Sequence, residues 1–198
     1  MSNMDTEILE AVTHVSKLSR RDFLRAGSVA AGLLAAGVTG IAPNVARASV
    51  PEGIAHMSES EYAVFHRLME VLLPTEGTKL VAPQTLPVLQ TVDGAFLATL
   101  PPHVLQGLKG GVAYFNEAPK EAFGAAFVDL SDADATAFCD ALASSDQVPP
   151  RALFNALKFL VVTAYWAIPP AWSGVRYDGP VFDAWGLEYA GNAPLPQT

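Results

Sequence analysis

The stretch of sequence that decides the fold is residues 151–168, which read RALFNALKFLVVTAYWAI. Wound as a helix, this run carries apolar side chains almost all round, and such a helix is buried on every side. Asn155 and Lys158 interrupt it, and its uninterrupted apolar part, residues 159–168, is too short to cross a bilayer. We therefore predict the central helix of a helical domain rather than a membrane span.

Four longer helices are predicted ahead of this central one, each from apolar residues that recur at helical spacing. Two of them open on capping boxes, and prolines mark the other boundaries. These signals are Ser58 with Glu61, Pro74, Pro101 with Pro102, Pro119, and Ser131 with Asp134. The second of the four covers residues 86–100. No alternating strand pattern appears, so the sequence predicts a single compact all-α domain of about five helices over residues 58–198.

The character of the chain changes after Pro169 and Pro170. Residues 171–198 are rich in Gly and Pro, yet they hold five aromatic residues: Trp172, Tyr177, Phe182, Trp185 and Tyr189. A disordered tail would be poor in aromatic residues, so we expect an ordered, irregular segment. Two interpretations stay open. The rings pack on the domain's own helices, as buried tryptophans commonly do, or some of them anchor a partner protein.

The N-terminus resembles a twin-arginine export signal. The candidate recognition residues are Arg20, Arg21, Phe23 and Leu24. A weakly apolar stretch follows, and the small residues Ala46 and Ala48 precede Ser49 as a cleavage site. We predict that residues 1–48 are a signal removed after Ala48, that residues 49–57 are a linker, and that the mature chain is periplasmic. The alternative is an uncleaved membrane anchor.

Charge and cysteine content restrict the partners of the mature chain. Its 150 residues are enough for one domain with a real core. They carry seven Lys and Arg against sixteen Asp and Glu, a net charge of −9. This argues against nucleic acid and anionic membranes, which need a basic face, so we expect membrane contact only through a complex. Cys139 is the single cysteine, so no internal disulfide is expected.

Cofactor motifs are absent from the sequence. It has no C-x-x-C-H haem attachment, cysteine cluster, zinc pair or H-E-x-x-H, and the Gly110-Gly111 pair lacks a third glycine for a dinucleotide fingerprint. The isolated His66, His103 and Cys139 lack partners at the spacing that metal binding or nucleophilic catalysis needs. Helix caps and a solvated face explain the acidic residues of 129–140. We therefore assign no catalytic, cofactor-binding or metal residue, and expect export together with a partner that carries the cofactor.

Two elements of the C-terminal part resemble those of a known family. The run from Phe154 to Ala167, then a turn, then Gly174-Val-Arg-Tyr177-Asp-Gly179-Pro180, looks like the C-terminal signature of the gluconate 2-dehydrogenase subunit 3 family. The similarity spans most of residues 58–182, including the early helix that closes on Pro74. One departure is the stretch from Trp166 to Pro170, where members more often carry small polar residues.

The resemblance implies a non-catalytic small subunit of a periplasmic dehydrogenase. In such assemblies the large subunit is an FAD enzyme of the glucose–methanol–choline oxidoreductase type, and a multihaem cytochrome c often accepts the electrons. The small subunit supplies the export signal and assists maturation of the large one. The rival hypothesis is a stand-alone periplasmic helical enzyme or small-ligand binder that uses the aromatic segment as its pocket.

The candidate contacts with a partner lie in the C-terminal signature: Trp172, Arg176, Tyr177, Gly179 and Pro180. Turns at Gly174 and Gly179-Pro180 would present Arg176 and Tyr177 outward, and arginine binds carboxylates in a bidentate fashion. The alternative is that Tyr177 packs inside while Arg176 is merely solvated.

Overall fold

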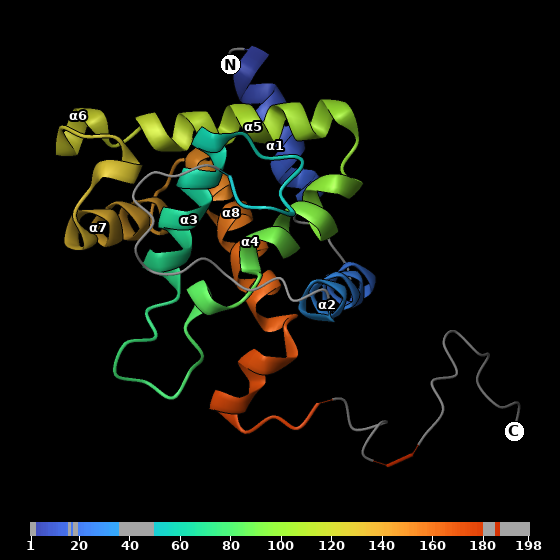
Figure 1. Ribbon diagram of the computed structural model, residues 1–198. Coiled ribbons are helices and arrows are strands. Elements are labelled where there is room, and N and C mark those ends of the chain that lie inside the picture. The colour runs from blue at the N-terminus through green and yellow to red at the C-terminus, as the bar shows by residue number, and fades with distance from the viewer. Residues whose placement is uncertain (1–2, 16, 18–19, 36–49, 180–184, 187–198) are drawn as a thin grey trace, which may run out of the picture.

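The computed structural model describes residues 3–15, 17, 20–35, 50–179 and 185–186 (Figure 1). All regular structure among them is helical, which confirms the all-α prediction. These residues form eight α-helices where the sequence analysis expected about five. The three additional ones are a short single-turn helix after Pro119 and two helices within residues 1–48.

The predicted central helix is α8, Val148–Trp166, with prolines at its first turn (Figure 1). It packs against α1, α3, α4 and α7. Its fully or almost fully buried residues are Leu153, Phe154, Ala156, Leu157, Leu160, Val161, Ala164 and Tyr165. One strip is solvent-exposed, however: Asn155, Lys158 and Phe159. Residues three and four apart share a helix face, so the expectation of burial on every side was wrong for this strip.

The helices around α8 begin and end largely where the sequence indicated. The helix α3, Glu59–Leu72, opens on the Ser58–Glu61 capping box. The helix α5, Pro102–Glu117, lies across one end of the molecule (Figure 1), and the short α6, Lys120–Phe123, follows Pro119. The helix α7, Asp132–Ala143, is capped by the Ser131 hydroxyl, which accepts a hydrogen bond from the Asp134 N–H. A 3₁₀ turn, η4, Phe127–Asp129, precedes it.

The prediction of one regular helix over residues 86–100 is corrected. A 3₁₀ turn, η1, Pro83–Thr85, leads into α4, Val88–Thr91, then a π-helical turn, η2, Val92–Phe96, and a 3₁₀ turn, η3, Leu97–Thr99. The apolar side chains share a face as expected, but the hydrogen-bond pattern changes twice. Asp93 lies in the widened turn, where its carboxylate accepts three backbone hydrogen bonds from residues 55–57.

Two helices of the N-terminal segment pack against the domain. The first, α1, Asn3–Val15, lies on α5 and α8 (Figure 1). The second, α2, Arg20–Ala35, begins at the paired arginines and lies on α4 and η2. The proposed cleavage residues Ala46, Ala48 and Ser49 lie outside the described residues, so cleavage stays a prediction.

The chain turns sharply after α8 into a 3₁₀ segment, η5, Pro169–Val175. No single helix of the described residues is long and apolar enough to cross a membrane; α8 and η5 reach that length only together, bent by 87°.

Candidate partner interface at the end of the central helix

The end of α8 is fixed by Tyr165. Its side chain is fully buried, and its hydroxyl donates a 2.8 Å hydrogen bond to the Val81 carbonyl. Burial raises the pKa of Tyr165 above its ordinary value. The Trp166 ring meets the Tyr165 ring edge to face, with centroids 5.0 Å apart. The buried hydroxyl therefore ties the loop after α3 to the end of the central helix.

The turn η5 is pressed against the same loop at Gly174. A Cβ built on Gly174 would lie 2.6 Å from the Lys79 carbonyl oxygen and 2.8 Å from the Leu80 Cα. Both of these atoms are backbone, so no side-chain rotation could relieve the overlap. Only glycine permits this close approach, which sets the path of the chain toward Arg176 and Tyr177.

Trp172 and Tyr177 form an aromatic pair on this corner. The indole N–H of Trp172 donates a 2.8 Å hydrogen bond to the Trp166 carbonyl, which holds the ring partly buried against the domain. The Tyr177 ring meets it edge to face at 5.1 Å between centroids and is 48% exposed. One ring is thus anchored and the other is presented to solvent.

Arg176, between these two rings in the sequence, has a left-handed backbone with φ of 56°. A left-handed backbone costs a residue other than glycine about 1–2 kcal/mol. Among the described residues, Arg176 is the only one other than glycine that has a positive φ. The Arg176 side chain is exposed and has no ion-pair partner in the described part of the chain. Strained residues cluster at functional sites, so the strain marks this corner as a candidate site.

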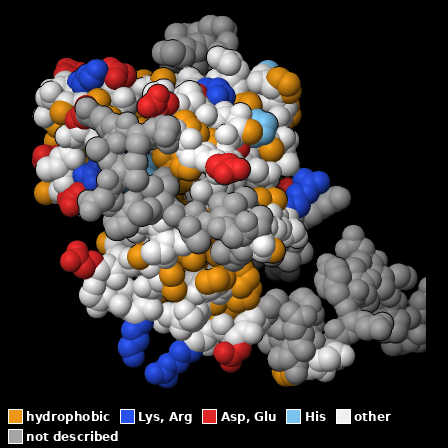
Figure 2. Space-filling model, in the orientation of Figure 1, with side chains coloured by type: hydrophobic (Ala, Val, Ile, Leu, Met, Phe, Trp, Pro, Cys, Tyr) orange, Lys and Arg blue, Asp and Glu red, His pale blue; other side chains and the backbone are white. Residues whose placement is uncertain are grey.

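The corner carries exposed apolar side chains as well as charged ones. Val175 is 50% exposed beside Tyr177. Figure 2 shows hydrophobic side chains gathered over the end of the molecule where α8 leads into η5, with Lys and Arg side chains and one acidic side chain at the lower edge. Aromatic residues and arginine together are the composition of interface hot spots.

Four of the five predicted contact residues lie in this corner. Gly179 has a φ of 101° and approaches the Trp172 ring, to which a Cβ would come within 3.5 Å. Pro180, Phe182 and Tyr189 lie outside the described residues. Trp185, which the sequence analysis grouped with these aromatics, is 71% exposed.

The sequence pattern of one protein family, gluconate 2-dehydrogenase subunit 3, matches residues 59–179. The chain belongs to this family. The match runs from the first residue of α3 to Gly179, so it includes the whole corner just described. No curated protein and no solved structure matched the chain. As its name states, a subunit 3 is part of a dehydrogenase assembly with partner subunits.

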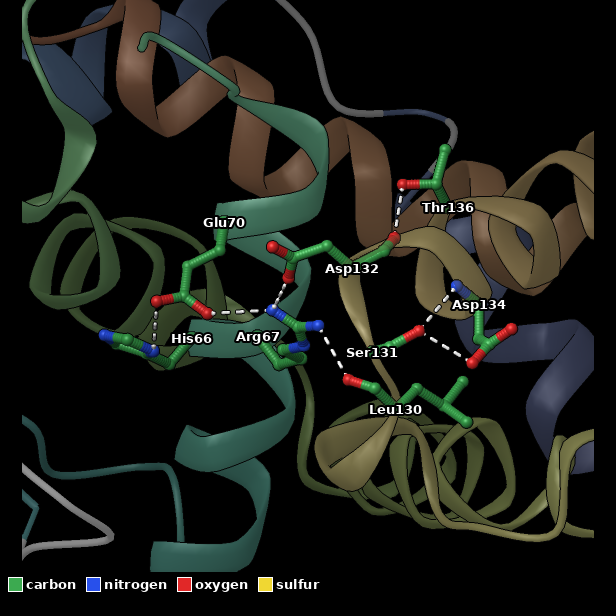
Figure 3. A network of polar contacts seen from close by, with 8 residues as sticks. All are labelled: His66, Arg67, Glu70, Leu130, Ser131, Asp132, Asp134 and Thr136. Carbon is green, nitrogen blue, oxygen red and sulfur yellow. Dashed lines mark hydrogen bonds and ion pairs between the residues drawn. The ribbon is translucent and has the colours of Figure 1, made fainter.

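A second cluster of polar side chains in this subunit 3 chain is built around Arg67 of α3 (Figure 3). The guanidinium pairs with Asp132 at 2.8 Å and Glu70 at 3.4 Å, and donates a 2.8 Å hydrogen bond to the Leu130 carbonyl. His66 lies 3.7 Å from the other oxygen of Glu70. The Arg67 guanidinium thus contacts two carboxylates and joins α3 to the start of α7. We interpret this network as a structural clasp.

Cys139 of α7 is buried and has no disulfide partner. Burial, and secondarily the neighbouring Asp140, raise its pKa to about 11, while the charge of Arg67 lowers it somewhat. A thiol protonated at neutral pH is a weak nucleophile. The structure therefore favours a packing role for Cys139 in this family member.

A small cavity of about 10 Å³ lies between α3 and the segment that contains η1 and α4. Its lining includes Tyr62, His66, Gln84 and Gln90. The Tyr62 hydroxyl is buried without a hydrogen-bond partner, and burial raises its pKa to about 12. This volume has room for about one water molecule, which the hydroxyl could bind, and is too small for a sugar. No group of three or more metal-ligating side chains occurs in the described part of the chain.

Sequence reasoning missed two residues that hold the structure in place. Asp93 was given no role, although its carboxylate binds a chain segment more than thirty residues away. Gly174 was read as a turn residue, although its function is close packing against Lys79 and Leu80. A carboxylate inside an otherwise apolar run was the available signal for Asp93, since such a group needs hydrogen-bond donors when it is buried.

Proposed function

We propose that this chain is the non-catalytic small subunit of a periplasmic FAD-dependent dehydrogenase that oxidises a sugar acid, a sugar or an alcohol. The observation that carries the proposal is the family match over residues 59–179, which places the chain among subunits of a dehydrogenase. The exposed corner at the end of that match supports a binding role. Its Tyr177 and Arg176 side chains are exposed to solvent.

The corner offers a coherent set of contacts for a large subunit. Trp172 is fixed by its hydrogen bond to Trp166 and supports the exposed Tyr177 ring. The exposed Arg176 guanidinium can form a bidentate pair with a carboxylate of the partner. A new ion pair of this kind, shielded by the neighbouring rings, would offset the backbone strain at Arg176.

The redox chemistry belongs to the partners in this proposal. The large subunit, of the glucose–methanol–choline oxidoreductase type, binds FAD, and a third subunit with haem c accepts the electrons. The small subunit supports folding or flavin loading of the large one by binding it before export. Twin-arginine export carries folded cargo, so a single signal on the small subunit would serve the whole pair.

The export role is tested by replacing Arg20 and Arg21 together with lysine and fractionating the cells. We expect both this chain and the flavoprotein encoded beside it to stay in the cytoplasm, since the twin-arginine route recognises the arginine pair. Replacing Arg25, which lies outside the pair, with lysine is the matched control and should leave export unchanged. A large subunit that still reached the periplasm in the double variant would show that it does not depend on this chain for export.

A further inference from the structure

The N-terminal helix α1 is seated on the domain through an apolar stripe. The buried face of α1 packs on α5 and α8, and its side chains are at most 7% exposed: Ile8, Ala11, Val12 and Val15. Glu10, at the rim, lies 3.4 Å from His103 at the start of α5. These contacts are those of an amphipathic helix in an apolar groove.

Glycines shape the surface that receives the N-terminal helices. A Cβ on Gly111 of α5 would lie 2.8 Å from Leu153 Cδ1 and 3.7 Å from Ile8 Cγ2, so its absence lets α1, α5 and α8 approach one another. On the second contact, a Cβ on Gly94 of η2 would lie 3.4 Å from Val29 Cγ1 of α2. Ala26 and Ala30 of α2 are fully buried there.

Cleavage after Ala48 would remove both helices and leave this surface open. In the chain that remains, Asp93 of η2 still accepts hydrogen bonds from the N–H groups of residues 55–57. A contiguous exposed apolar face marks a binding site on a soluble protein. A second copy of the chain is disfavoured as its occupant, because each mature chain carries a net charge of −9 and two copies repel.

We propose that this surface, formed by α5, α8 and the α4–η2 turn, binds an apolar helical segment of the large subunit in the mature complex, and that α1 and α2 occupy it until the signal is removed. The inference rests on the proposed function and adds a second contact face to the C-terminal corner. The N-terminal helices then delay full assembly until export is complete, while the corner already holds the pair together.

The first test titrates two forms of this chain with the flavoprotein encoded beside it and compares their affinities. One form is the full-length chain, and the other is the processed chain isolated from the periplasm. If the helices occupy the surface in more than nine chains in ten, the processed chain should bind at least about tenfold more tightly. Ile8→Asp with Val12→Asp should release α1 and bring the full-length chain to the tighter affinity. Thr13→Asp, on the exposed side of α1, is the matched control and should leave the weaker affinity unchanged.

The second test changes the surface itself in the processed chain. Gly94 is exposed, so Gly94→Glu should leave thermal stability unchanged. A Cβ there would lie 3.4 Å from Val29 of α2, so a glutamate side chain should overlap a helix seated as α2 is and weaken binding at least about tenfold. Gly110→Glu is the control, because a Cβ there meets nothing within 4 Å.

The outcomes separate the two proposals. Equal affinity of the full-length and processed chains, together with normal binding by Gly94→Glu, would overturn the second face and leave the subunit role intact. A processed chain that forms a stable homodimer through this surface, one that Gly94→Glu disrupts, would also overturn it. Failure of every form to bind the flavoprotein would instead contradict the proposed function.

Discussion

At the scale of single residues, Trp172 and Tyr177 touch each other but depend on the domain to different degrees. Trp172 is partly buried and donates a hydrogen bond to the Trp166 carbonyl, whereas Tyr177 is 48% exposed. An exposed ring contributes little to folding, so its presence on the surface is better explained by a partner than by the core. Binding and stability should therefore respond differently to the two truncations.

We predict that Tyr177→Ala changes the free energy of unfolding by less than about 0.5 kcal/mol and weakens assembly with the large subunit by about 2 kcal/mol. Trp172→Ala should lower the free energy of unfolding by about 3 kcal/mol, because a large packed ring is lost. Urea unfolding and titration with the large subunit measure the two effects. Tyr114→Ala, a similarly exposed tyrosine on α5, should change neither quantity, and a Tyr177→Ala variant as unstable as Trp172→Ala would place Tyr177 in the core.

At the scale of elements, the Asp93 carboxylate joins η2 to the segment that precedes α3. It is 1% exposed and accepts hydrogen bonds of 2.9–3.0 Å from the N–H groups of Ala55, His56 and Met57. Three donors oriented toward one buried carboxylate hold the segment before α3 in place.

We predict that Asp93→Asn lowers the free energy of unfolding by about 2 kcal/mol, because charge-assisted hydrogen bonds are lost and the amide nitrogen faces a donor. Hydrogen exchange should also become faster at residues 55–57. The exposed Asp146→Asn is the matched control and should have little effect. An Asp93→Asn variant with unchanged stability and exchange would show that the carboxylate does not anchor this segment.

Local spacing predicted the helices well where each depends on its own residues. Ser58 with Glu61, Pro102 and Ser131 mark starts that the structure confirms, and the apolar run of residues 151–168 is the central helix. Spacing could not show the change of pitch at η2, because the partners of Asp93 lie more than thirty residues away. It also could not decide which aromatic side chains of the C-terminal segment face solvent, since that depends on how Gly174 packs against Lys79.

At the scale of the whole molecule, the buried Cys139 thiol and Tyr62 hydroxyl make the free energy of unfolding depend on pH in the alkaline range. Burial raises the pKa of Cys139 from 9.0 to about 11 and that of Tyr62 from 10.0 to about 12. Above pH 9 the unfolded chain loses these protons first, so the folded state binds more protons and stability falls as pH rises.

We predict that the contribution of these two groups to the free energy of unfolding is constant up to about pH 9 and decreases between about pH 9 and 12. Urea unfolding at a series of pH values measures it. Cys139→Ala should show a smaller decrease between pH 9 and 11 than the unmodified chain. A steeper or equal decrease in that variant would contradict a raised thiol pKa as one cause.

The central claim, that this chain is the small subunit of a flavin-dependent dehydrogenase, is tested most directly by isolating it from the periplasm under its own promoter. A tag after Thr198 allows purification, and mass spectrometry with the flavin absorption spectrum identifies what accompanies the chain. The account predicts a large subunit with bound FAD in a fixed ratio to this chain, and less of it when Tyr177 is replaced by alanine. A chain recovered alone, without any flavoprotein, would contradict the account.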